Sequence, residues 1–270
     1  MSRRVEGKVA LVTGAARGQG RAHALRLAEE GADLILMDVC APVADLGYPP
    51  SSTSDLEETT ALCESAGARV SAHRGDVRSY DEVATAVRQG TEALGRLDIV
   101  VANAAIAAWG RLWEISSDQW NAVVDTNLTG VWHTLKASIP AMIDGGRGGS
   151  IVTISSVAGL KSLPGQAHYS ASKHAVVGLT RSVAIELAPY GIRANSLHPW
   201  AVQTPMAEDS TLSELLQAHP DYLVSFGQVL RQPNIAAPRD IADAMLWLAS
   251  DESKTVTGIA LPVDLGATAV

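Results

Sequence analysis

Short apolar runs rich in β-branched residues alternate along the whole chain with longer stretches of helical period. The candidate strands are Lys8–Thr13, Asp33–Asp38, Arg69–Arg74, Asp98–Ala102, Ser150–Ser155, Ile192–Leu197 and Ile259–Val263. Runs without polar alternation, such as Ile99–Ala102, indicate burial on both faces, as in a parallel sheet covered by helices. The alternation therefore predicts one α/β domain over 1–270, with a doubly wound parallel sheet of about seven strands and right-handed crossovers.

Three segments carry the signals of a helix start. Ser79–Glu82 predicts a capping box, in which the serine and the glutamate each satisfy a free backbone N–H. Ser116–Gln119 repeats this pattern before a long helix that we expect to end near Met142. Ser54–Glu57 predicts a third start, and Gly67 would close that helix after its last turn.

Two long segments fall outside the alternation, residues 39–53 and residues 199–238. The second contains one helix-like stretch, Leu212–Ala218. Loops of this length are uncommon in compact domains unless they have a function. Both segments follow strands, at the edge of a parallel sheet where ligands bind.

Composition and charge exclude several classes of function. The chain has 21 basic and 29 acidic residues, a net charge of −8, which argues against nucleic acid or an anionic membrane as partner. Its most apolar run, Ile99–Trp109, is interrupted by Asn103 and is shorter than the ~20 residues of a membrane span. We also expect no signal peptide. Cys40 and Cys63 cannot build a disulfide scaffold, and neither they nor the histidines have metal-ligand spacing, so we expect a reduced, cytoplasmic setting and no metal.

A glycine-rich turn lies between the first strand and the following helix. It contains Gly14, Arg17, Gly18, Gln19 and Gly20. Glycines let a backbone approach a pyrophosphate closely, and the helix N-terminus presents free N–H groups to it. The spacing is GxxxGxG rather than GxGxxG, and a plain tight turn is the alternative interpretation.

Asp38 ends the second strand, where a carboxylate can accept hydrogen bonds from adenosine ribose hydroxyls. It would repel a 2′-phosphate, which favours NAD over NADP. Arg17 argues the other way, because it could pair with a phosphate, but Val39 leaves no second basic group beside the ribose. A solvated aspartate at a strand end is the alternative.

A second set of residues suits proton transfer. Tyr169 and Lys173 lie four apart in a predicted helix and share one face, with Ser156 just after the fifth strand and Asn127 in the preceding long helix. Tyrosine, with a pKa near 10, is a poor base at neutral pH, but an adjacent ammonium stabilises the phenolate. Lowering that pKa by about 3 units takes roughly 4 kcal/mol. Ser155 is an alternative to Ser156, although the spacing to Tyr169 favours Ser156.

Together these motifs make the chain resemble the short-chain dehydrogenase/reductase family over essentially its full length. The resemblance rests on TGAARGQG (13–20), Asp76-Val77, Asn103-Ala104, Asn127, Ser156 and the YxxxK of Tyr169–Lys173. It implies a Rossmann-type oxidoreductase in which Tyr169 moves the proton, Ser156 holds the substrate oxygen, and Lys173 and Asn127 support the tyrosine. By the same resemblance Asp76 contacts the adenine, Val77, Asn103 and Ala104 also bind the cofactor, and Asn103 braces the central strand.

The chain departs from the family pattern after the sixth strand, where Pro199-Trp200 replaces the usual Pro-Gly. Thr204 still stands where the family bonds the nicotinamide carboxamide, and Val202 can donate its backbone N–H. Trp200 either narrows the substrate space or packs in the protein. A smaller departure is an alanine in Asn103-Ala-Ala105, where glycine is usual.

The insert 39–53, the run Asp38-Val-Cys-Ala-Pro and the segment HPWAVQTPM (198–206) look like the carveol-dehydrogenase-like branch, often called mycofactocin-coupled. This resemblance implies NAD that exchanges slowly, electrons that leave through an external redox partner, and an insert that covers the adenosine end. A surface decoration is the alternative for the insert. The family resemblance also suggests a homotetramer.

Apolar side chains indicate the substrate class. The candidates for its lining are Trp109, Trp113, Leu160, Leu163 and Trp200, with residues 199–238 as a lid. Such a lining favours an apolar secondary alcohol or its ketone, such as a terpenoid or another ring compound. Within the family the alternative is an NADPH-dependent 3-oxoacyl-carrier reductase, and outside it a non-catalytic NAD-binding protein.

Overall fold

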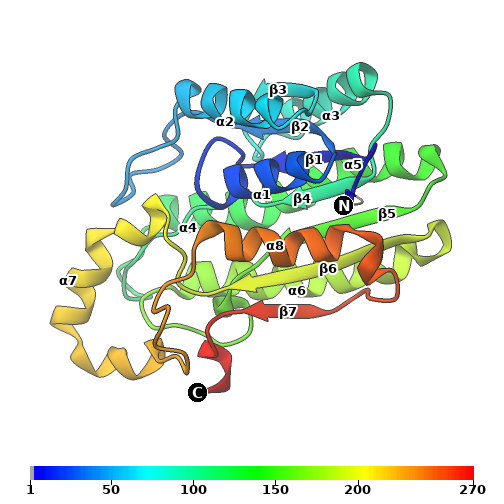
Figure 1. Ribbon diagram of the computed structural model, residues 1–270. Coiled ribbons are helices and arrows are strands. Elements are labelled where there is room, and N and C mark those ends of the chain that lie inside the picture. Colours follow the sequence, from blue (N-terminus) through cyan, green and yellow to red (C-terminus); the bar gives the residue numbers. More distant parts are fainter. Residues whose placement is uncertain (1–2) are drawn as a thin grey trace.

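A computed structural model describes residues 3–270, and its centre is one parallel sheet (Figure 1). The strands are β1 (Val9–Thr13), β2 (Asp33–Asp38), β3 (Val70–Arg74), β4 (Ile99–Ala102), β5 (Gly149–Ile154), β6 (Ile192–Pro199) and β7 (Ala260–Val263). Their order is β3-β2-β1-β4-β5-β6-β7, and every neighbouring pair is parallel. The predicted doubly wound α/β fold with seven strands is confirmed, with strand bounds within two residues of the prediction.

Two apolar cores lie on the two faces of this sheet. Along β1, Val9 and Leu11 face one core, and Ala10 and Val12 face the other, as the two-residue period of a strand requires. The helices α1 (Gly18–Glu29), α2 (Thr53–Ser65) and α8 (Pro238–Ala249) cover one face. The helices α3 (Tyr80–Leu94), α5 (Gly130–Gly145) and α6 (Ala167–Leu187) cover the other.

The helix starts differ in part from the predicted capping boxes. At α2 the box exists but begins two residues earlier than predicted: the Ser52 hydroxyl accepts the Asp55 N–H, and the Asp55 carboxylate accepts the Ser52 N–H. The start at Ser54 is therefore wrong, because Ser54 already lies in the first turn. The helix does end as expected, with Gly67 in the left-handed region just after it.

At α3 only half of the predicted box forms. The Ser79 hydroxyl accepts the Glu82 N–H at 3.4 Å, but the Glu82 carboxylate accepts the N–H of Asp76 instead of that of Ser79. The Glu82 carboxylate thus binds the backbone of the loop before α3 in place of the Ser79 N–H.

The predicted long helix after Ser116 is interrupted. It consists of α4 (Ser117–Val124), a π-helical turn (Asp125–Thr129) and α5, which ends at Gly145, three residues beyond the predicted end. Ser116 caps α4 as expected, but the Gln119 side chain donates to the carbonyl of Trp109. Asn127 lies inside the π turn, a feature that is frequent at functional sites.

The carboxyl ends of the strands form the functional edge of the sheet. The chain leaves β1 for β2 and β3, then returns to β4 on the other side of β1, so a crevice opens between the loops after β1 and β4. The segment 39–53 and α7 (Ser210–Ala218) project at this same end of the molecule (Figure 1). The helix α7 starts two residues before the predicted stretch, and 3₁₀ turns flank it at Pro205–Glu208 and Pro220–Phe226.

No helix within residues 3–270 has the length and apolar character needed to cross a membrane. The same residues hold no group of three or more His, Cys, Asp or Glu side chains able to bind a metal ion.

His23, on the buried face of α1, should make the fold sensitive to acid. Its side chain is fully buried, neither ring nitrogen has a hydrogen-bond partner among residues 3–270, and burial lowers its pKa to about 3. The unfolded chain takes up this proton below pH ~6.5, so stability is complete above that pH and falls as the pH drops, by about 2 kcal/mol at pH 5. We expect His23→Leu to lack this loss when urea unfolding is compared at pH 7 and pH 5. An equal loss in both proteins would contradict the prediction.

Candidate active site

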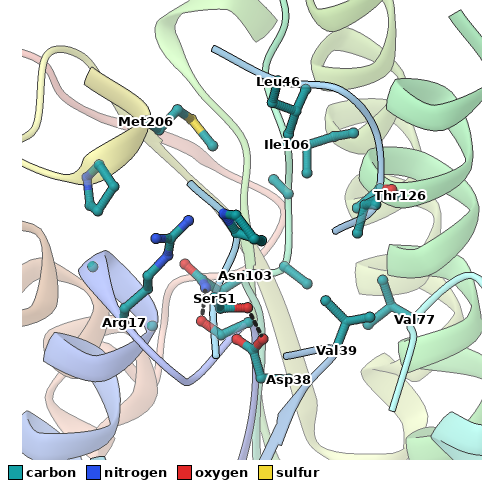
Figure 2. Close-up of a pocket in the computed structure, with 18 of the residues that line it drawn as sticks. Arg17, Asp38, Val39, Leu46, Ser51, Val77, Asn103, Ile106, Thr126 and Met206 are labelled. Carbon is teal, nitrogen blue, oxygen red and sulfur yellow. Dashed lines mark hydrogen bonds between the residues drawn. The ribbon is translucent and has the colours of Figure 1, made fainter. Parts of the chain in front are cut away.

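A cavity of about 410 Å³ occupies the carboxyl edge of the sheet (Figure 2). It is lined by nearly all of the predicted cofactor residues, namely Gly14, Arg17, Gly18, Gln19, Gly20, Asp38, Asp76, Val77, Asn103, Ala104, Tyr169, Lys173 and Thr204. Val202 lies outside this lining, buried in a bridge to Ala236. Segments remote in the sequence thus meet around one space.

The glycine loop carries the N-terminus of α1 into the cavity. Gly14 and Gly18 adopt left-handed backbone angles (φ +66° and +55°), which glycine tolerates best. The Asn103 amide fixes this loop by donating to the carbonyls of Thr13 (2.9 Å) and Gly14 (3.2 Å). The N-terminus of α1 has no side-chain cap and no acidic residue in its first turn. Its free N–H groups therefore suit an anion such as a pyrophosphate.

Two buried oxygen atoms in the lining have no hydrogen-bond partner within residues 3–270, Gln19 Oε1 and Thr126 Oγ1. Buried polar atoms are rarely left unpaired, so these two fit a polar ligand in the cavity. Thr126 is a residue that sequence reasoning missed. Nothing in its neighbourhood marks it, because only the π turn Asp125–Thr129 places it in the lining.

The carboxylate of Asp38 is held by three donors. Its Oδ2 accepts the Ala16 N–H at 3.0 Å, and its Oδ1 accepts the Cys40 N–H at 3.0 Å and the Ser51 hydroxyl at 2.6 Å (Figure 2). Cys40 has φ +49°, an uncommon value for a residue with a side chain, which turns the chain back over the carboxylate. These donors fix the orientation of Asp38 toward the cavity that it lines.

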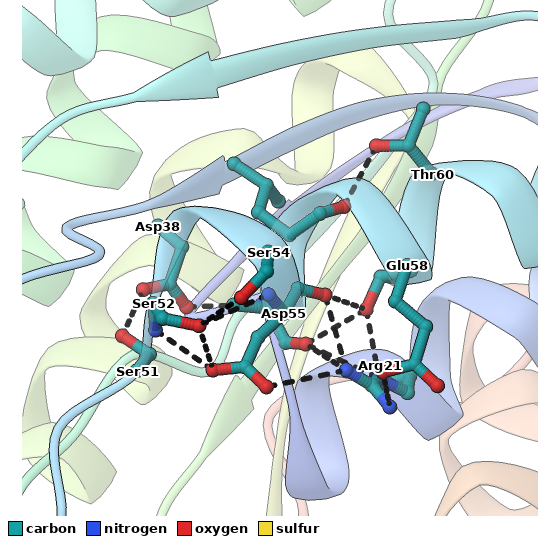
Figure 3. Close-up of polar contacts among 11 residues, drawn as sticks. Arg21, Asp38, Ser51, Ser52, Ser54, Asp55, Glu58 and Thr60 are labelled. Carbon is teal, nitrogen blue, oxygen red and sulfur yellow. Dashed lines mark hydrogen bonds and ion pairs between the residues drawn. The ribbon is translucent and has the colours of Figure 1, made fainter.

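Residues 39–53, here called the strap, cross over the cavity. The Arg17 guanidinium donates to the Pro49 carbonyl of the strap. Arg17 therefore has a partner inside the protein, which weakens its earlier interpretation as a phosphate ligand. The far end of the strap is anchored by Ser52 and Asp55, and Arg21 donates to the Asp55 carbonyl at 3.0 Å (Figure 3).

Asp76, which is predicted to contact the adenine, forms an ion pair with Arg78. The Arg78 guanidinium donates to both of its carboxylate oxygens, the shortest contact being 2.6 Å. Burial acts to raise the pKa of Asp76, but the hydrogen bonds and charge of Arg78 outweigh it, and the pKa lies below its usual value. Asp76 is thus held as an anion in the lining.

Tyr169 and Lys173 share one face of α6 and both line the cavity. The Lys173 ammonium donates to the Ile154 carbonyl at 2.8 Å and lies 5.5 Å from the centre of the Tyr169 ring. Burial raises the pKa of Tyr169 to about 12, against which the neighbouring Ser156 side chain acts, and burial lowers the pKa of Lys173 to about 7. Burial opposes the charged form of both groups. Because the phenolate and the ammonium carry opposite charges, ionisation of either group favours ionisation of the other.

The structure distinguishes the two serines after β5. The Ser155 hydroxyl donates to the Lys173 carbonyl at 2.9 Å, which uses its proton inside the fold. The Ser156 hydroxyl accepts the Ala158 N–H at 3.1 Å, and its side chain faces Tyr169, whose pKa it acts to lower by hydrogen bonding. Ser155 lines the cavity, whereas Ser156, the next residue, is outside its lining. The backbone of Ser156 is held by His198, whose Nδ1 lies 2.7 Å from the Ser156 carbonyl.

Asn127 does not contact Lys173 directly. Its amide exchanges two hydrogen bonds with the backbone of Ile106, each 2.9 Å long, and its Nδ2 lies 3.4 Å from the Ser172 hydroxyl. It therefore ties the loop after β4 to α6, which carries Tyr169.

None of the five predicted substrate-lining residues, all within the described part of the chain, belongs to the lining of this cavity: Trp109, Trp113, Leu160, Leu163 and Trp200 all lie outside it. Trp109 and Trp200 instead flank Phe226, with ring centres 6.0 and 6.1 Å from it. Trp113 is 73% exposed, Leu160 is 37% exposed and Leu163 is buried. Trp109 and Trp200 therefore pack on another protein side chain, Trp113 is mainly exposed, and the apolar lining comes from residues that the sequence did not single out.

Comparison with known proteins agrees with this geometry. A family model described as enoyl-(acyl carrier protein) reductase matches residues 14–268. An uncharacterised NAD-dependent oxidoreductase of Mycobacterium tuberculosis is 51% identical over 265 residues, 97% of this chain and 96% of its own length. A (-)-trans-carveol dehydrogenase of Rhodococcus erythropolis is 45% identical over 274 residues, 98% of this chain and 99% of its own. The crystal structure of a carveol dehydrogenase from Mycobacterium avium in complex with NAD superposes with a TM-score of 0.94 at 46% identity, covering 99% of each chain. The chain belongs to the short-chain dehydrogenase/reductase family.

Proposed function

We propose that this protein is an NAD-dependent dehydrogenase that interconverts an apolar cyclic secondary alcohol and its ketone, with Tyr169 as general base or acid. The observation that carries the proposal is that Tyr169 and Lys173 line the same cavity as the glycine loop and Asp38. Relatives named as a carveol dehydrogenase and an NAD-dependent oxidoreductase support the cofactor and the substrate class.

Different residues of the lining would contact different parts of NAD. The glycine loop and the N-terminus of α1 would take the pyrophosphate, and Asp38 the ribose hydroxyls. Asp76 and Val77 would contact the adenine, and Thr204 the carboxamide. NAD, when bound, accepts the hydride, and its positive ring favours the phenolate form of Tyr169.

During alcohol oxidation the Tyr169 phenolate takes the hydroxyl proton, and the Ser156 hydroxyl donates a hydrogen bond to the alcohol oxygen as it gains negative charge. The ammonium of Lys173, 5.5 Å from the ring centre, stabilises the phenolate by roughly 3 kcal/mol at an effective dielectric constant of about 20. Asn127 positions α6 against the loop after β4 through Ile106 and Ser172.

Two alternatives are less well supported. An NADPH-dependent 3-oxoacyl-carrier reductase would have to place a 2′-phosphate beside the Asp38 carboxylate, and the net charge of −8 does not favour an acidic carrier protein. A non-catalytic NAD-binding protein would have no use for Ser156 beside Tyr169 or for the buried Lys173 that follows it on α6.

Two further parts of the proposal concern partners. The strap contacts at Ser51 and Pro49 support slow exchange of NAD. Reoxidation by an external redox partner of the mycofactocin type would follow from such slow exchange and is proposed on the resemblance alone. Exposed apolar side chains on α5 and α6, Trp132 at 45% and Ile185 at 76%, support a homotetramer built through these helices.

The test of the proposal begins with the nucleotide that the purified protein carries. Denaturation followed by mass spectrometry should release NAD, and a panel of cyclic secondary alcohols should reduce an artificial electron acceptor. Dependence of turnover on added NADPH would favour the acyl-carrier reductase instead.

Asp38 should decide the choice between NAD and NADP. In Asp38→Asn the charged acceptor for the ribose hydroxyls and its repulsion of a 2′-phosphate are both lost. We expect NAD to bind about tenfold more weakly, and the NAD-to-NADP affinity ratio to fall by at least that factor. Calorimetry on nucleotide-stripped protein measures both constants. Asp144→Asn, an exposed change at the end of α5, is the matched control, and an unchanged ratio in Asp38→Asn would contradict the assignment.

A further inference from the structure

The strap reaches much farther across the cavity than the adenosine end. It leaves the sheet at β2, and the strand order places β1 between β2 and β4. Two strand spacings amount to about 10 Å, well within the reach of a segment of this length. Strap residues line the cavity from Val39 to Ser51.

Tyr48 fixes the strap to the loop after β4. Its hydroxyl accepts the Ala107 N–H at 3.0 Å and lies 3.3 Å from the Ala107 carbonyl, to which it donates. Ala107 follows Ile106, the residue that Asn127 holds with two hydrogen bonds. The strap is therefore pinned to the same loop that Asn127 connects to α6.

The strap also contacts the lid. A Cβ atom on Gly47 would lie only 2.0 Å from Asp209 Oδ1, so the strap passes against Asp209 with no room for a side chain. Asp209 is buried and caps α7 by accepting the Thr211 N–H at 2.9 Å. The strap thus lies directly against the N-cap of α7 in the lid.

An apolar cluster joins the strap to Tyr169. Its buried members are Ile106, Ala108 and Val123, against which Val43, Ala44, Leu46, Ala122 and Tyr169 pack. Leu46 lies beside Ile106 and across the cavity from Met206 of the lid (Figure 2). Leu46 and Tyr169 therefore border the same apolar part of the cavity.

We propose that the strap forms one wall of the alcohol site, with Leu46 as a specificity-determining residue and Tyr48 as the residue that positions it. This inference rests on the proposed function. In this proposal the strap and Met206, rather than the predicted tryptophans, form the surface that limits the size of the substrate. It also gives one segment two roles, since Ser51 orients Asp38 at the adenosine end.

The test measures how well the protein discriminates two cyclic ketones by size. Calorimetry gives the dissociation constants of cyclohexanone and 4-tert-butylcyclohexanone for the protein loaded with oxidised NAD, a complex in which the ketone cannot react. Leu46→Ala should change the ratio of the two constants by about tenfold in favour of the larger ketone, and Leu46→Phe should change it in the opposite direction. Tyr48→Phe, which loses only the hydroxyl, should shift the ratio in the direction of Leu46→Ala by a smaller factor.

The matched control is Leu160→Ala, the same truncation at a predicted lining residue that lies outside the cavity lining. It should leave the ratio unchanged, and an unaltered NAD content should show that each variant is folded. A wild-type ratio in both Leu46 variants, a shift reproduced by Leu160→Ala, or no binding of either ketone to the wild type would overturn the inference. Absence of alcohol oxidation alongside a ratio that depends on Leu46 would instead contradict the proposed function alone.

Discussion

Tyr169→Phe should lower the rate of alcohol oxidation by at least ~10³-fold, because a positioned acid or base contributes up to about four orders of magnitude. The phenyl ring still fills the place where Tyr169 packs beside Ile106, Ala108 and Val123, so the variant should fold and keep its nucleotide. Turnover with an artificial electron acceptor gives the rate, and mass spectrometry after denaturation gives the NAD content.

The control for this variant is Tyr190→Phe, which removes a hydroxyl from a half-exposed side chain in the turn after α6. It should match the wild type in both measurements. A Tyr169→Phe protein that retains turnover within tenfold of the wild type would remove Tyr169 from the chemistry. Full loss of turnover with full NAD content would exclude the alternative of a protein that only binds the nucleotide.

The fold was predictable because a parallel strand that is buried on both faces is apolar at every position. Ile99–Ala102 is apolar at every position, and the structure buries all four residues between two layers of helices. The meeting of the predicted cofactor residues in one cavity was predictable for a related reason. Gly14, Asp38 and Asn103 each follow or end a strand, and parallel strands deliver their carboxyl ends to one edge.

The parts that the sequence could not give depend on contacts between distant segments. Thr126 enters the lining only because a π turn interrupts the helix, and no residue type in Asp125–Thr129 requires such a turn. The reach of the strap depends on Tyr48 meeting Ala107, a pairing without any periodic signal.

The predicted substrate-lining residues lie outside the cavity lining for a different reason. Tryptophan is as common in packing as in ligand sites, and Trp109 and Trp200 both pack against Phe226. A prediction based on residue type alone had no means of separating these two uses. Leu46 and Met206, which line the cavity, carry no distinguishing mark in the sequence.

Lys173→Met should shift the pH dependence of alcohol oxidation rather than scale it down uniformly. Methionine is long and apolar, so it suits the buried position of Lys173. It carries no charge, and the phenolate of Tyr169 loses roughly 3 kcal/mol of stabilisation, which equals about 2 pKa units. Burial already raises the pKa of Tyr169 to about 12. The acid limb of the kcat/KM profile should therefore move up by about 2 pH units, giving a roughly 100-fold loss at pH 7 that diminishes only as the pH approaches the raised pKa of Tyr169.

The shape of that profile separates an electrostatic role from a structural one. Lys173 also donates to the Ile154 carbonyl, and loss of this bond alone would lower kcat/KM by the same factor at every pH. Lys254→Met, a change at an exposed lysine, should reproduce the wild-type profile. Rescue of Lys173→Met at high pH would show that the ammonium acts through the ionisation of Tyr169. A profile lowered in parallel would show instead that Tyr169 does not owe its ionisation to Lys173, and the proton-transfer part of the proposed mechanism would have to be abandoned.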